Sequence, residues 1–459
     1  AAFPCCRQPV RLRYATAVRR HPVFAMTLSH ASRIALALTL SGSALHAQRP
    51  GTQRRPAPTS RPVAAQLDSL TDVSPHAMRL WREAVVVDTH NDMPTKVADE
   101  KYDPDVRNPI GFGPGFGSTD YPRLLQSGIT GQFFSAFVDA PYALMTPDSS
   151  FARAMLLTRQ VHAFVKRHPD KLFFATSGAD LRRAKRQGKI AVFVGVEGGH
   201  AIEGSITKLR QLHAAGVRYM TLTWNNGNSW AGAAAGQNNS RTAGLTAQGK
   251  AIVREMNRIG VLVDISHVSD TTFWDAVATS TRPVIASHSS SRALSLHRRN
   301  LTDDMLRAVA KTGGVVNVNF FSQFIDSMYI QRFAGIEPRL RAEDRRLRDA
   351  GTPNEQIRTS VASLRQRLLD SIPETPLSVL VDHIDHIAKV AGVDHVGIGS
   401  DFDGVTALPI GMEDVTMLPR IAQHLIDRGY SDTDIKKILG GNMLRVLETA
   451  IDPTERKRR

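Results

Sequence analysis

Eight short apolar segments, separated by stretches of helical character, constrain this chain more than any other feature of its sequence. Most are near-continuous runs of branched and aromatic residues, which is typical of parallel strands buried on both faces. Amphipathic segments such as 206–214, 249–258 and 303–311 lie between them. The expected strands are 84–89, 129–137, 191–196, 217–223, 261–266, 284–287, 314–320 and 396–400.

Eight strand–helix units over about 370 residues predict an α/β protein, a (β/α)8 TIM-like barrel with helical insertions. A doubly wound open sheet is the alternative that the same alternation allows. The longest insertion, roughly 322–376, is charged and helical in pattern. It is either a solvated helical excursion or a lid over the barrel mouth.

The formal net charge of +15 is concentrated at the two ends of the chain. Residues 1–62 contain ten Arg and no acidic residue, and the last four residues are all basic. The remainder holds 44 basic and 43 acidic residues. Because the body is nearly neutral, it lacks the basic surface that binding to nucleic acid requires, and we expect no nucleic-acid partner.

The N-terminal part has the organisation of an export signal. A short basic region after Met26 is followed by an apolar stretch at 34–40 and by small residues before Gln48. We therefore expect an exported protein, periplasmic or secreted. The expected segments are an over-extended start at 1–25, a signal peptide at 26–47, a flexible linker at 48–69, the barrel domain at 70–452 and a basic tail at 453–459.

Two further classes of protein are disfavoured by simple counts. No apolar run reaches the roughly 20 residues that a membrane-spanning helix needs, so we expect no membrane span. Both cysteines, Cys5 and Cys6, lie near the N-terminus. The rest of the chain therefore has no disulfide framework, no Cys-ligated zinc and no thiol nucleophile.

Five of the expected strands run into ionisable side chains. In a TIM barrel the carboxyl ends of the strands carry the chemistry. Burying so many ionisable groups at one end is costly unless something compensates them, and a pair of divalent metal ions would. Imidazole together with carboxylate suits zinc. The segments are Asp88-Thr-His90-Asn-Asp92, Glu197-Gly-Gly-His200, Asp264-Ile-Ser-His267, Ala286-Ser-His288 and Ser400-Asp401-Phe-Asp403-Gly404.

A pair of metal ions about 3.5–4 Å apart can hold a shared hydroxide and polarise a carbonyl group, which suits the hydrolysis of an amide. Other catalytic signatures are missing from the sequence: there is no Gly-x-Ser-x-Gly elbow and no P-loop. The glycine-rich segment 111–117 does not join a strand to a helix, so we expect a loop there.

In the same order and at comparable spacing, these segments resemble the membrane (renal) dipeptidase family of zinc peptidases. The resemblance covers most of residues 80–450. It implies a (β/α)8 barrel that holds two Zn²⁺ per chain. Residue by residue, it implies that His90 and Asp92 ligate the first zinc, that Glu197 bridges both ions, and that His267 and His288 ligate the second.

The resemblance also assigns roles in catalysis. A water molecule bridging the ions would be the nucleophile, and Asp401 would pass its proton to the leaving amine. Arg299 matches the residue that binds the carboxylate of the substrate, a task that suits its bidentate fork. We expect His200 and Asp403 to support the ligands without binding a metal ion themselves.

One position departs from the family pattern. Better-studied members carry Thr-Leu-Thr-His after the fourth strand, and that His contacts the substrate near the scissile bond, whereas this chain has Trp224. The indole of Trp donates one hydrogen bond but cannot be protonated. The sequence therefore leaves open which group stabilises the oxyanion and which substrates are preferred. Asn225 or Asn226 is a candidate replacement for the family His.

Residues outside these segments have plainer interpretations. His383 and His386 precede the last strand, so we expect them in the outer helical layer in surface or packing roles. Asn317 and Asn319 alternate along the seventh expected strand, and one of them should point into the barrel mouth.

The sequence thus predicts a binuclear zinc dipeptidase acting on small dipeptides, including those with a D-residue on the C-terminal side. One alternative is a metal-dependent hydrolase of another small amide or a lactam, with Trp224 reshaping the pocket. Another is a non-catalytic binding protein on the same barrel, which retention of every ligand position disfavours. Relatives often form dimers, so a homodimer is an expected assembly. The chain ends in basic residues, so we expect no lipid anchor.

Overall fold

Eight parallel strands close into a barrel in the computed structural model, which describes residues 70–235 and 243–451. The hydrogen-bonded order is β2-β1-β9-β8-β7-β6-β5-β4, and pairing of β2 with β4 closes the ring. The predicted barrel is confirmed and the open sheet is excluded. The strands are β1 (Val87–Asp88), β2 (Gly131–Phe137), β3 (Leu172–Phe174), β4 (Ile190–Glu197), β5 (Val217–Thr221), β6 (Leu262–Asp264), β7 (Val284–Ala286), β8 (Val315–Val318) and β9 (Val396–Ile398).

All eight predicted strands coincide with strands of the barrel, and one further strand was not predicted. Strand β3 pairs only with the beginning of β4, between Ile190 and Val192, and β5 takes over that edge from Val194 onward. Three residues carry too little pattern to reveal such a strand from sequence. The predicted over-extended start, signal peptide and linker, at 1–69, and the predicted basic tail, at 453–459, lie outside the described residues.

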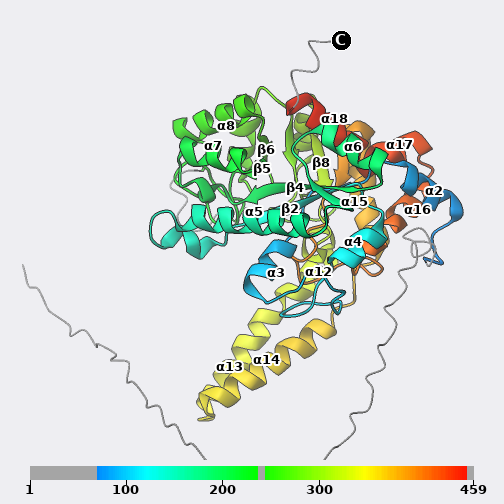
Figure 1. The fold of residues 1–459 in the computed structure, drawn as a ribbon. Coiled ribbons are helices and arrows are strands. Elements are labelled where there is room, and N and C mark those ends of the chain that lie inside the picture. The colour runs from blue at the N-terminus through cyan, green and yellow to red at the C-terminus, as the bar shows by residue number, and fades with distance from the viewer. Residues whose placement is uncertain (1–69, 236–242, 452–459) are drawn as a thin grey trace, which may run out of the picture. The chain divides into compact units, whose positions relative to one another are not determined.

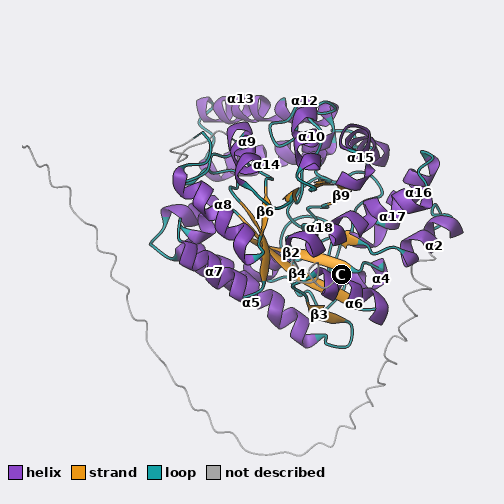
Figure 2. Ribbon diagram, turned by 90° about the horizontal axis from the view of Figure 1, so that it is seen from above, coloured by secondary structure: helices purple, strands orange, loops and turns teal. Residues whose placement is uncertain are grey.

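Helices surround the barrel on all sides (Figure 2). Helices α7 and α10 have the boundaries that the periodicity predicts. Around the barrel lie α2 (Pro75–Glu83), α3 (Met93–Asp99), α4 (Tyr121–Ser127), α5 (Ser149–Arg167), α6 (Gly178–Gln187), α7 (Ile206–Ala214), α8 (Ala247–Ile259), α9 (Asp270–Thr279), α10 (Asp303–Lys311), α15 (Leu377–Ala391), α16 (Pro419–Asp427), α17 (Asp432–Lys436) and α18 (Asn442–Ala450). Shorter helical turns are η1 (Ala140–Leu144), η2 (Gly199–Ile202), η3 (Val393–His395), η4 (Val415–Met417) and η5 (Lys437–Gly441).

Hydroxyl side chains cap the five consecutive helices from α6 to α10. In each case the side chain accepts a hydrogen bond from a backbone N–H of the first turn, which would otherwise lack a partner. Helices α6 and α8 end at Gly188 and Gly260, which adopt the left-handed conformation that glycine tolerates. The capping residues of α6 to α10 are Ser177, Ser205, Thr246, Ser269 and Thr302.

Aromatic side chains fill the barrel interior. The rings of Phe133 on β2 and Phe193 on β4 stack at 4.5 Å, and Phe133 also lies 5.4 Å from the ring of Tyr219 on β5. Because β2 and β5 are not hydrogen-bonded neighbours, these rings meet across the interior. Met443 and Leu447 of α18 belong to the same cluster. Figure 1 shows α18 at one end of the barrel, with α3 and α12 towards the other.

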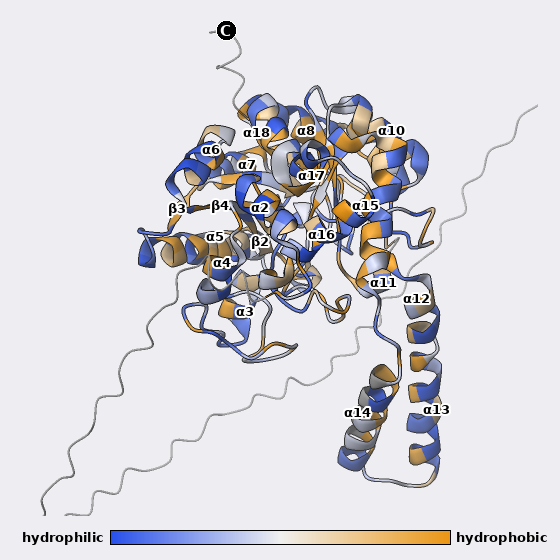
Figure 3. Cartoon of the chain, turned by 90° about the vertical axis from the view of Figure 1, so that its right-hand side faces the viewer, coloured by the Kyte–Doolittle hydropathy of each residue, from blue (hydrophilic) through white to orange (hydrophobic). Residues whose placement is uncertain are grey.

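The insertion at 322–376 is helical, as predicted. Helices α13 and α14 lie side by side and extend away from the barrel (Figure 3). They share a small apolar cluster with Ile336, Leu340 and Ile372 at its centre. No helix within the described residues has the length and apolar character that crossing a membrane requires. The inserted helices are α11 (Ser322–Ile325), α12 (Ser327–Ala334), α13 (Ile336–Asp349) and α14 (Asn354–Asp370).

The stacked rings inside the barrel yield a test of the core. Truncation of the fully buried Phe193 to Ala should lower the free energy of unfolding by about 3–5 kcal/mol, because it removes apolar contacts and leaves a cavity. The matched change Phe112→Ala, at a side chain that is 48% exposed, should cost less than about 0.5 kcal/mol. Denaturant unfolding of both variants measures the difference, and equal losses would contradict this packing.

Candidate metal centre

The carboxylate of Glu197, at the end of β4, lies between imidazoles from three other strands. Its Oε1 is 2.9 Å from Nε2 of His267 and 3.4 Å from Nε2 of His288, which follow β6 and β7. Its Oε2 is 3.4 Å from Nε2 of His90, which follows β1. One oxygen of this carboxylate therefore faces the nitrogens of His267 and His288, and the other faces that of His90.

A second pair of carboxylates converges on His90. Its Nε2 is 3.3 Å from Oδ2 of Asp92 and 3.9 Å from Oδ1 of Asp401, which follows β9. All three residues are buried. Two sets of ligand atoms lie close enough to hold a metal ion: His90, Glu197 and His288, and His90, Asp92 and Asp401.

The backbone that presents these groups is strained. His267 and Asp401 adopt positive φ angles of 66° and 63°, which non-glycine residues rarely do outside functional sites. Gly404 is a glycine for a different reason. A Cβ atom there would lie 2.3 Å from Oδ2 of Asp92 and 2.7 Å from Oδ1 of Asp401, so the absence of a side chain keeps the space between these carboxylates open.

A buried tyrosine fixes the ring of His90. The hydroxyl of Tyr219 lies 2.8 Å from Nδ1 of His90, on the side of the ring away from Asp92 and Asp401. The Tyr219 ring needs the space beside Gly195, where a Cβ atom would lie 2.0 Å from it. This contact joins the aromatic core of the barrel to the site above it.

A serine and an aspartate fix the ring of His288 in the same way. The hydroxyl of Ser287 lies 2.7 Å from Nδ1 of His288 and donates to Oδ2 of Asp264 at 2.5 Å. Asp264 also accepts from the backbone N–H of Ser287 at 2.9 Å. Because the Ser287 proton goes to Asp264, Nδ1 of His288 is the donor and its Nε2 presents a lone pair to the site.

The electrostatic environment separates the imidazoles into two kinds. Burial, reinforced by the positive charge of Arg299, lowers the pKa of His267 to about 3. Burial and the proximity of His90 lower the pKa of His288 well below its usual range. Both rings are therefore neutral near pH 7, which is the form that binds metal ions.

His90 and Glu197 are shifted in the opposite sense. Burial opposes charge on both, but their mutual attraction outweighs it. Tyr219, Glu197 and Asp92 raise the pKa of His90, and His90 with the nearby rings of His267 and His288 lowers the pKa of Glu197. The carboxylates around His90 thus stabilise positive charge at this point.

Asp401 is held by an amide that the sequence placed near the barrel mouth. Nδ2 of Asn319, just beyond β8, donates to Oδ2 of Asp401 at 2.7 Å. Burial, together with the negative charges of Asp92 and Glu197, raises the pKa of Asp401 to about 7 although His90 opposes this. Asn317 points elsewhere and donates to the carbonyl oxygen of Ala286.

The residues present fit a pair of metal ions. Nε2 of His90 and Oδ1 of Asp92 are buried and have no hydrogen-bond partner among the described residues. Nε2 of His267 lies 2.9 Å from Nε2 of His288, so two neutral rings point their nitrogens at one place. Buried polar atoms without a hydrogen-bond partner, such as Nε2 of His90 and Oδ1 of Asp92, are costly unless a ligand compensates them. Imidazole and carboxylate donors without thiolates suit Zn²⁺.

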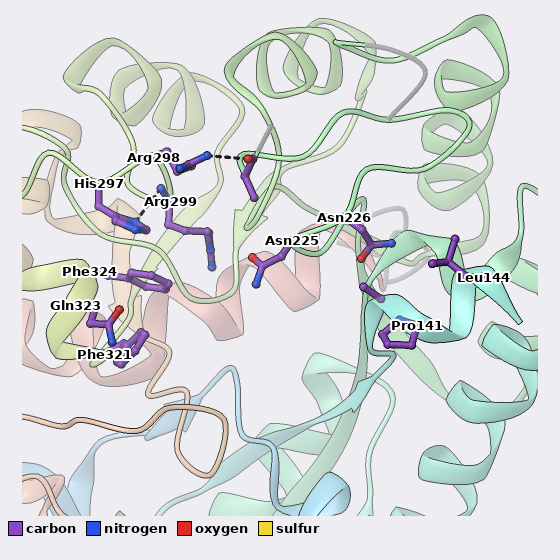
Figure 4. A pocket seen from close by; sticks show the side chains of 12 residues that line it. Pro141, Leu144, Asn225, Asn226, His297, Arg298, Arg299, Phe321, Gln323 and Phe324 are labelled. Carbon is purple, nitrogen blue, oxygen red and sulfur yellow. Dashed lines mark hydrogen bonds between the residues drawn. The ribbon is translucent and has the colours of Figure 1, made fainter. Parts of the chain in front are cut away.

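A cavity of about 690 Å³ opens beside these residues (Figure 4). Arg299 and Phe324 line one side, Pro141 and Leu144 line the other, and Asn225 lies between them. Helices α13 and α14 contribute none of its lining residues. The two helices therefore form a solvated excursion in this structure, whereas α11 helps to build the cavity wall.

Arg299 is a buried cation without a carboxylate at ion-pair distance among the described residues. Its Nη2 donates to the carbonyl oxygen of His288 at 3.0 Å, and its Nη1 donates to Oγ of Ser289 at 3.3 Å. The guanidinium carbon lies 5.2 Å from the centre of the Phe324 ring. Because a buried unpaired charge is costly, this arrangement suits an anionic ligand.

Trp224 lies at the edge of the site. Its ring packs edge-on against Phe137 at 4.8 Å and lies 6.3 Å from the ring of His267. The neighbouring Asn225 reaches the same imidazole, with its Oδ1 3.1 Å from Nδ1 of His267. Asn225 thus orients His267, a contact that the sequence did not reveal.

The other predicted residues have separate surroundings. His200 is buried beside Gly198, and neither ring nitrogen has a hydrogen-bond partner among the described residues. Oδ1 of Asp403 accepts from the backbone N–H of Ser118 at 2.7 Å and ties the loop after β9 to the loop before α4. A supporting role for these two residues stays a prediction.

Two histidines are structural, as expected. His383 on α15 is fully buried, with Nδ1 accepting from the backbone N–H of Ser291 at 3.0 Å and Nε2 2.9 Å from the carbonyl oxygen of Ile325. His386 lies 2.7 Å from Asp303. Both link α15 to neighbouring segments.

Sequence reasoning assigned no role to Tyr219, Asp264, Ser287 or Asp88. Asp88 accepts from the backbone N–H and hydroxyl of Ser400 at 2.8 and 2.6 Å and so joins β1 to the segment that carries Asp401. A signal was present for two of them, because Asp88 and Asp264 each end a strand shortly before a histidine. Tyr219 gave no signal, since its partner is 129 positions away.

Comparison with known proteins identifies the family. The model of the membrane dipeptidase family, peptidase family M19, matches residues 75–458. The chain belongs to this family. The resemblance seen in the sequence is therefore confirmed, and the chain is a metallopeptidase of the dipeptidase class.

Solved structures agree with this assignment. The probable dipeptidase PvdM from Pseudomonas aeruginosa is 26% identical, with a TM-score of 0.69 over 82% of this chain and 98% of its own. Dipeptidase AC, a metallopeptidase of family M19, is 24% identical, with a TM-score of 0.63 over 80% of this chain and 99% of its own. A Rhodobacter sphaeroides metallopeptidase, solved with a phosphinate mimic of L-Ala-D-Ala, is 23% identical, with a TM-score of 0.63 over 80% of this chain and 100% of its own. The last two likenesses concern the fold alone.

The open space at Gly404 can be tested directly. In the variant Gly404→Ala, the added methyl group displaces the carboxylates of Asp92 and Asp401, and dipeptide hydrolysis should fall about a hundredfold. The backbone at Gly404 lies outside the left-handed region and so accepts Ala, and a circular dichroism spectrum equal to that of the parent would establish that the variant is folded. Gly335→Ala, at a φ of −71°, is the control and should keep full activity. Unchanged hydrolysis in Gly404→Ala would show that this space is not used.

Proposed function

We propose that the chain is a binuclear zinc dipeptidase that hydrolyses small dipeptides, including those with a D-residue on the C-terminal side. The observation that carries the proposal is the position of Glu197, whose two oxygens face different sets of imidazole nitrogens. A carboxylate in this position can bridge two cations. Export through the signal peptide at 26–47 is part of the proposal and rests on the sequence alone.

Each ion would have its own ligands in addition to Glu197. His90 and Asp92 would hold the first ion, and His267 and His288 would hold the second. Tyr219 and the Ser287–Asp264 pair would keep the rings in the tautomer that presents Nε2. When bound, the two ions would acidify a water molecule and polarise the scissile carbonyl group.

The remaining steps depend on side chains of this chain. Arg299 binds the free carboxylate of the dipeptide and places the peptide bond near Glu197. Water adds to the carbonyl carbon, and Asp401 takes the proton from it. The bond from carbon to nitrogen then breaks, and Asp401 delivers this proton to the leaving amine. Asn319 keeps one oxygen of Asp401 occupied, so that the other oxygen carries the proton.

Substrate range is the part of the proposal that depends on Trp224. A ring that cannot be protonated stands where better-studied members have His, and Asn225 contacts His267 beside it. A panel of L,L and L,D dipeptides together with cyclic and acyclic amides distinguishes a dipeptidase from a hydrolase of another amide or a lactam. The mimic of L-Ala-D-Ala bound by the Rhodobacter protein makes L,D dipeptides the first choice.

The position of Glu197 between the two proposed ions predicts the effect of removing its carboxylate. Glu197→Ala should lose both bound metal and dipeptide hydrolysis, because neither ion keeps a complete set of ligands. Elemental analysis and an activity assay on the same sample measure the two losses. Glu343→Ala, on α13, should change neither. Normal turnover in Glu197→Ala would refute the assignment.

The proton carrier should be separable from the metal ligands. Asp401→Asn preserves the shape of the side chain and its bond to Asn319 but cannot accept a proton. We expect metal content to stay near that of the parent and kcat to fall by about 10²–10⁴-fold. Asp427→Asn, an exposed change on α16, is the control. A kcat within threefold of the parent, roughly the scatter of such effects, would assign proton transfer to another group.

A further inference from the structure

Two adjacent arginines line one side of the cavity beside the metal centre. Arg298 and Arg299 both contribute to its wall, and no Asp or Glu does. Among the described residues, no carboxylate oxygen lies within 4.0 Å of a nitrogen of either guanidinium group, which is the limit for an ion pair. The cavity is therefore cationic on this side.

The two arginines are held differently. The guanidinium of Arg299 is buried and donates to His288 and Ser289. Arg298 is exposed, and the one bond of its guanidinium among the described residues runs from Nη1 to the carbonyl oxygen of Ala235 at 2.7 Å. A guanidinium carries five N–H donors, so most of the Arg298 fork can serve a ligand.

The surroundings of His297 show the same positive charge. Burial, followed by the neighbouring Arg299, Arg298 and Arg292, lowers the pKa of His297 to about 4. Arg292 is itself neutralised by Asp270, at 2.7 Å for both nitrogens. The unbalanced charge at this wall therefore comes from Arg298 and Arg299.

A dipeptide with neutral side chains offers one carboxylate, which Arg299 takes in the proposed function. Arg298 then lacks an anionic partner. We infer that the cavity selects dipeptides whose C-terminal residue is Asp or Glu, with the side-chain carboxylate on Arg298 and the α-carboxylate on Arg299. This inference rests on the proposed dipeptidase function and names its substrate class.

The opposite wall defines the other residue of the substrate. Pro141 and Leu144 lie across the cavity from Arg299, as Figure 4 shows. They present apolar surface, and Leu144 is 71% exposed. When the acidic residue faces the arginines, the side chain of the N-terminal residue lies against this surface, which favours apolar groups such as that of Leu.

The test compares substrates that differ only in charge. Leu-Glu and Leu-Gln have nearly the same shape, as do Leu-Asp and Leu-Asn. For the parent enzyme we expect KM for the acidic member of each pair to be about fivefold lower, the size of a solvent-accessible ion pair. Added salt should reduce this ratio, because it screens the charge on Arg298.

Variants assign the preference to one residue. In Arg298→Gln the KM ratio between Leu-Gln and Leu-Glu should fall to about one, as expected when the ion pair is lost. In Arg79→Gln, which removes the same charge from an exposed position on α2, the parent ratio should persist. A circular dichroism spectrum equal to that of the parent establishes that each variant is folded.

The outcomes separate this inference from the function on which it rests. Equal KM values for Leu-Glu and Leu-Gln in the parent, or a ratio that survives in Arg298→Gln, would overturn the selection of acidic residues while leaving the dipeptidase intact. Metal-loaded enzyme that hydrolyses none of these dipeptides would overturn the proposed function and the inference together.

Discussion

The buried carboxylate of Glu197 is the constraint around which the barrel end is organised. A carboxylate removed from water is costly, and two more stand nearby on Asp92 and Asp401. The imidazoles of His90 and His267 reduce this cost, but they leave buried nitrogen and oxygen atoms without partners. A cluster with three carboxylates, in which two of the three imidazoles are neutral, is short of positive charge, and cations bound between these groups would supply it.

The fold supports this cluster from below. Tyr219 reaches from the aromatic core to His90, and it has room only because Gly195 lacks a side chain. Asp264 and Ser287 hold the ring of His288 in one orientation. Metal ligands whose second ring nitrogen is fixed in this way lose less freedom on binding. Stability of the barrel and geometry of the site therefore depend on the same contacts.

Much of this was predictable, and the failures have physical causes. Continuous apolar runs predicted all eight barrel strands, because strands buried on both faces consist mostly of apolar residues. The polar residues at the ends of these strands predicted the cluster of imidazoles and carboxylates, since parallel strands bring their carboxyl ends together. Contacts between distant positions, such as Tyr219 with His90 or Asn225 with His267, leave no local pattern. Strand β3 is too short to show periodicity.

The arrangement divides the work between the barrel and its loops. In the proposed function, strand ends hold the groups that bind metal ions and move a proton, whereas the segment with Arg299 and the turn with Leu144 line the cavity for the substrate. Elemental analysis of the purified protein tests the central claim most directly. We predict about two zinc ions per chain, as a bridging carboxylate requires. Correctly folded protein that takes up no metal ion, even when zinc is supplied, would contradict it.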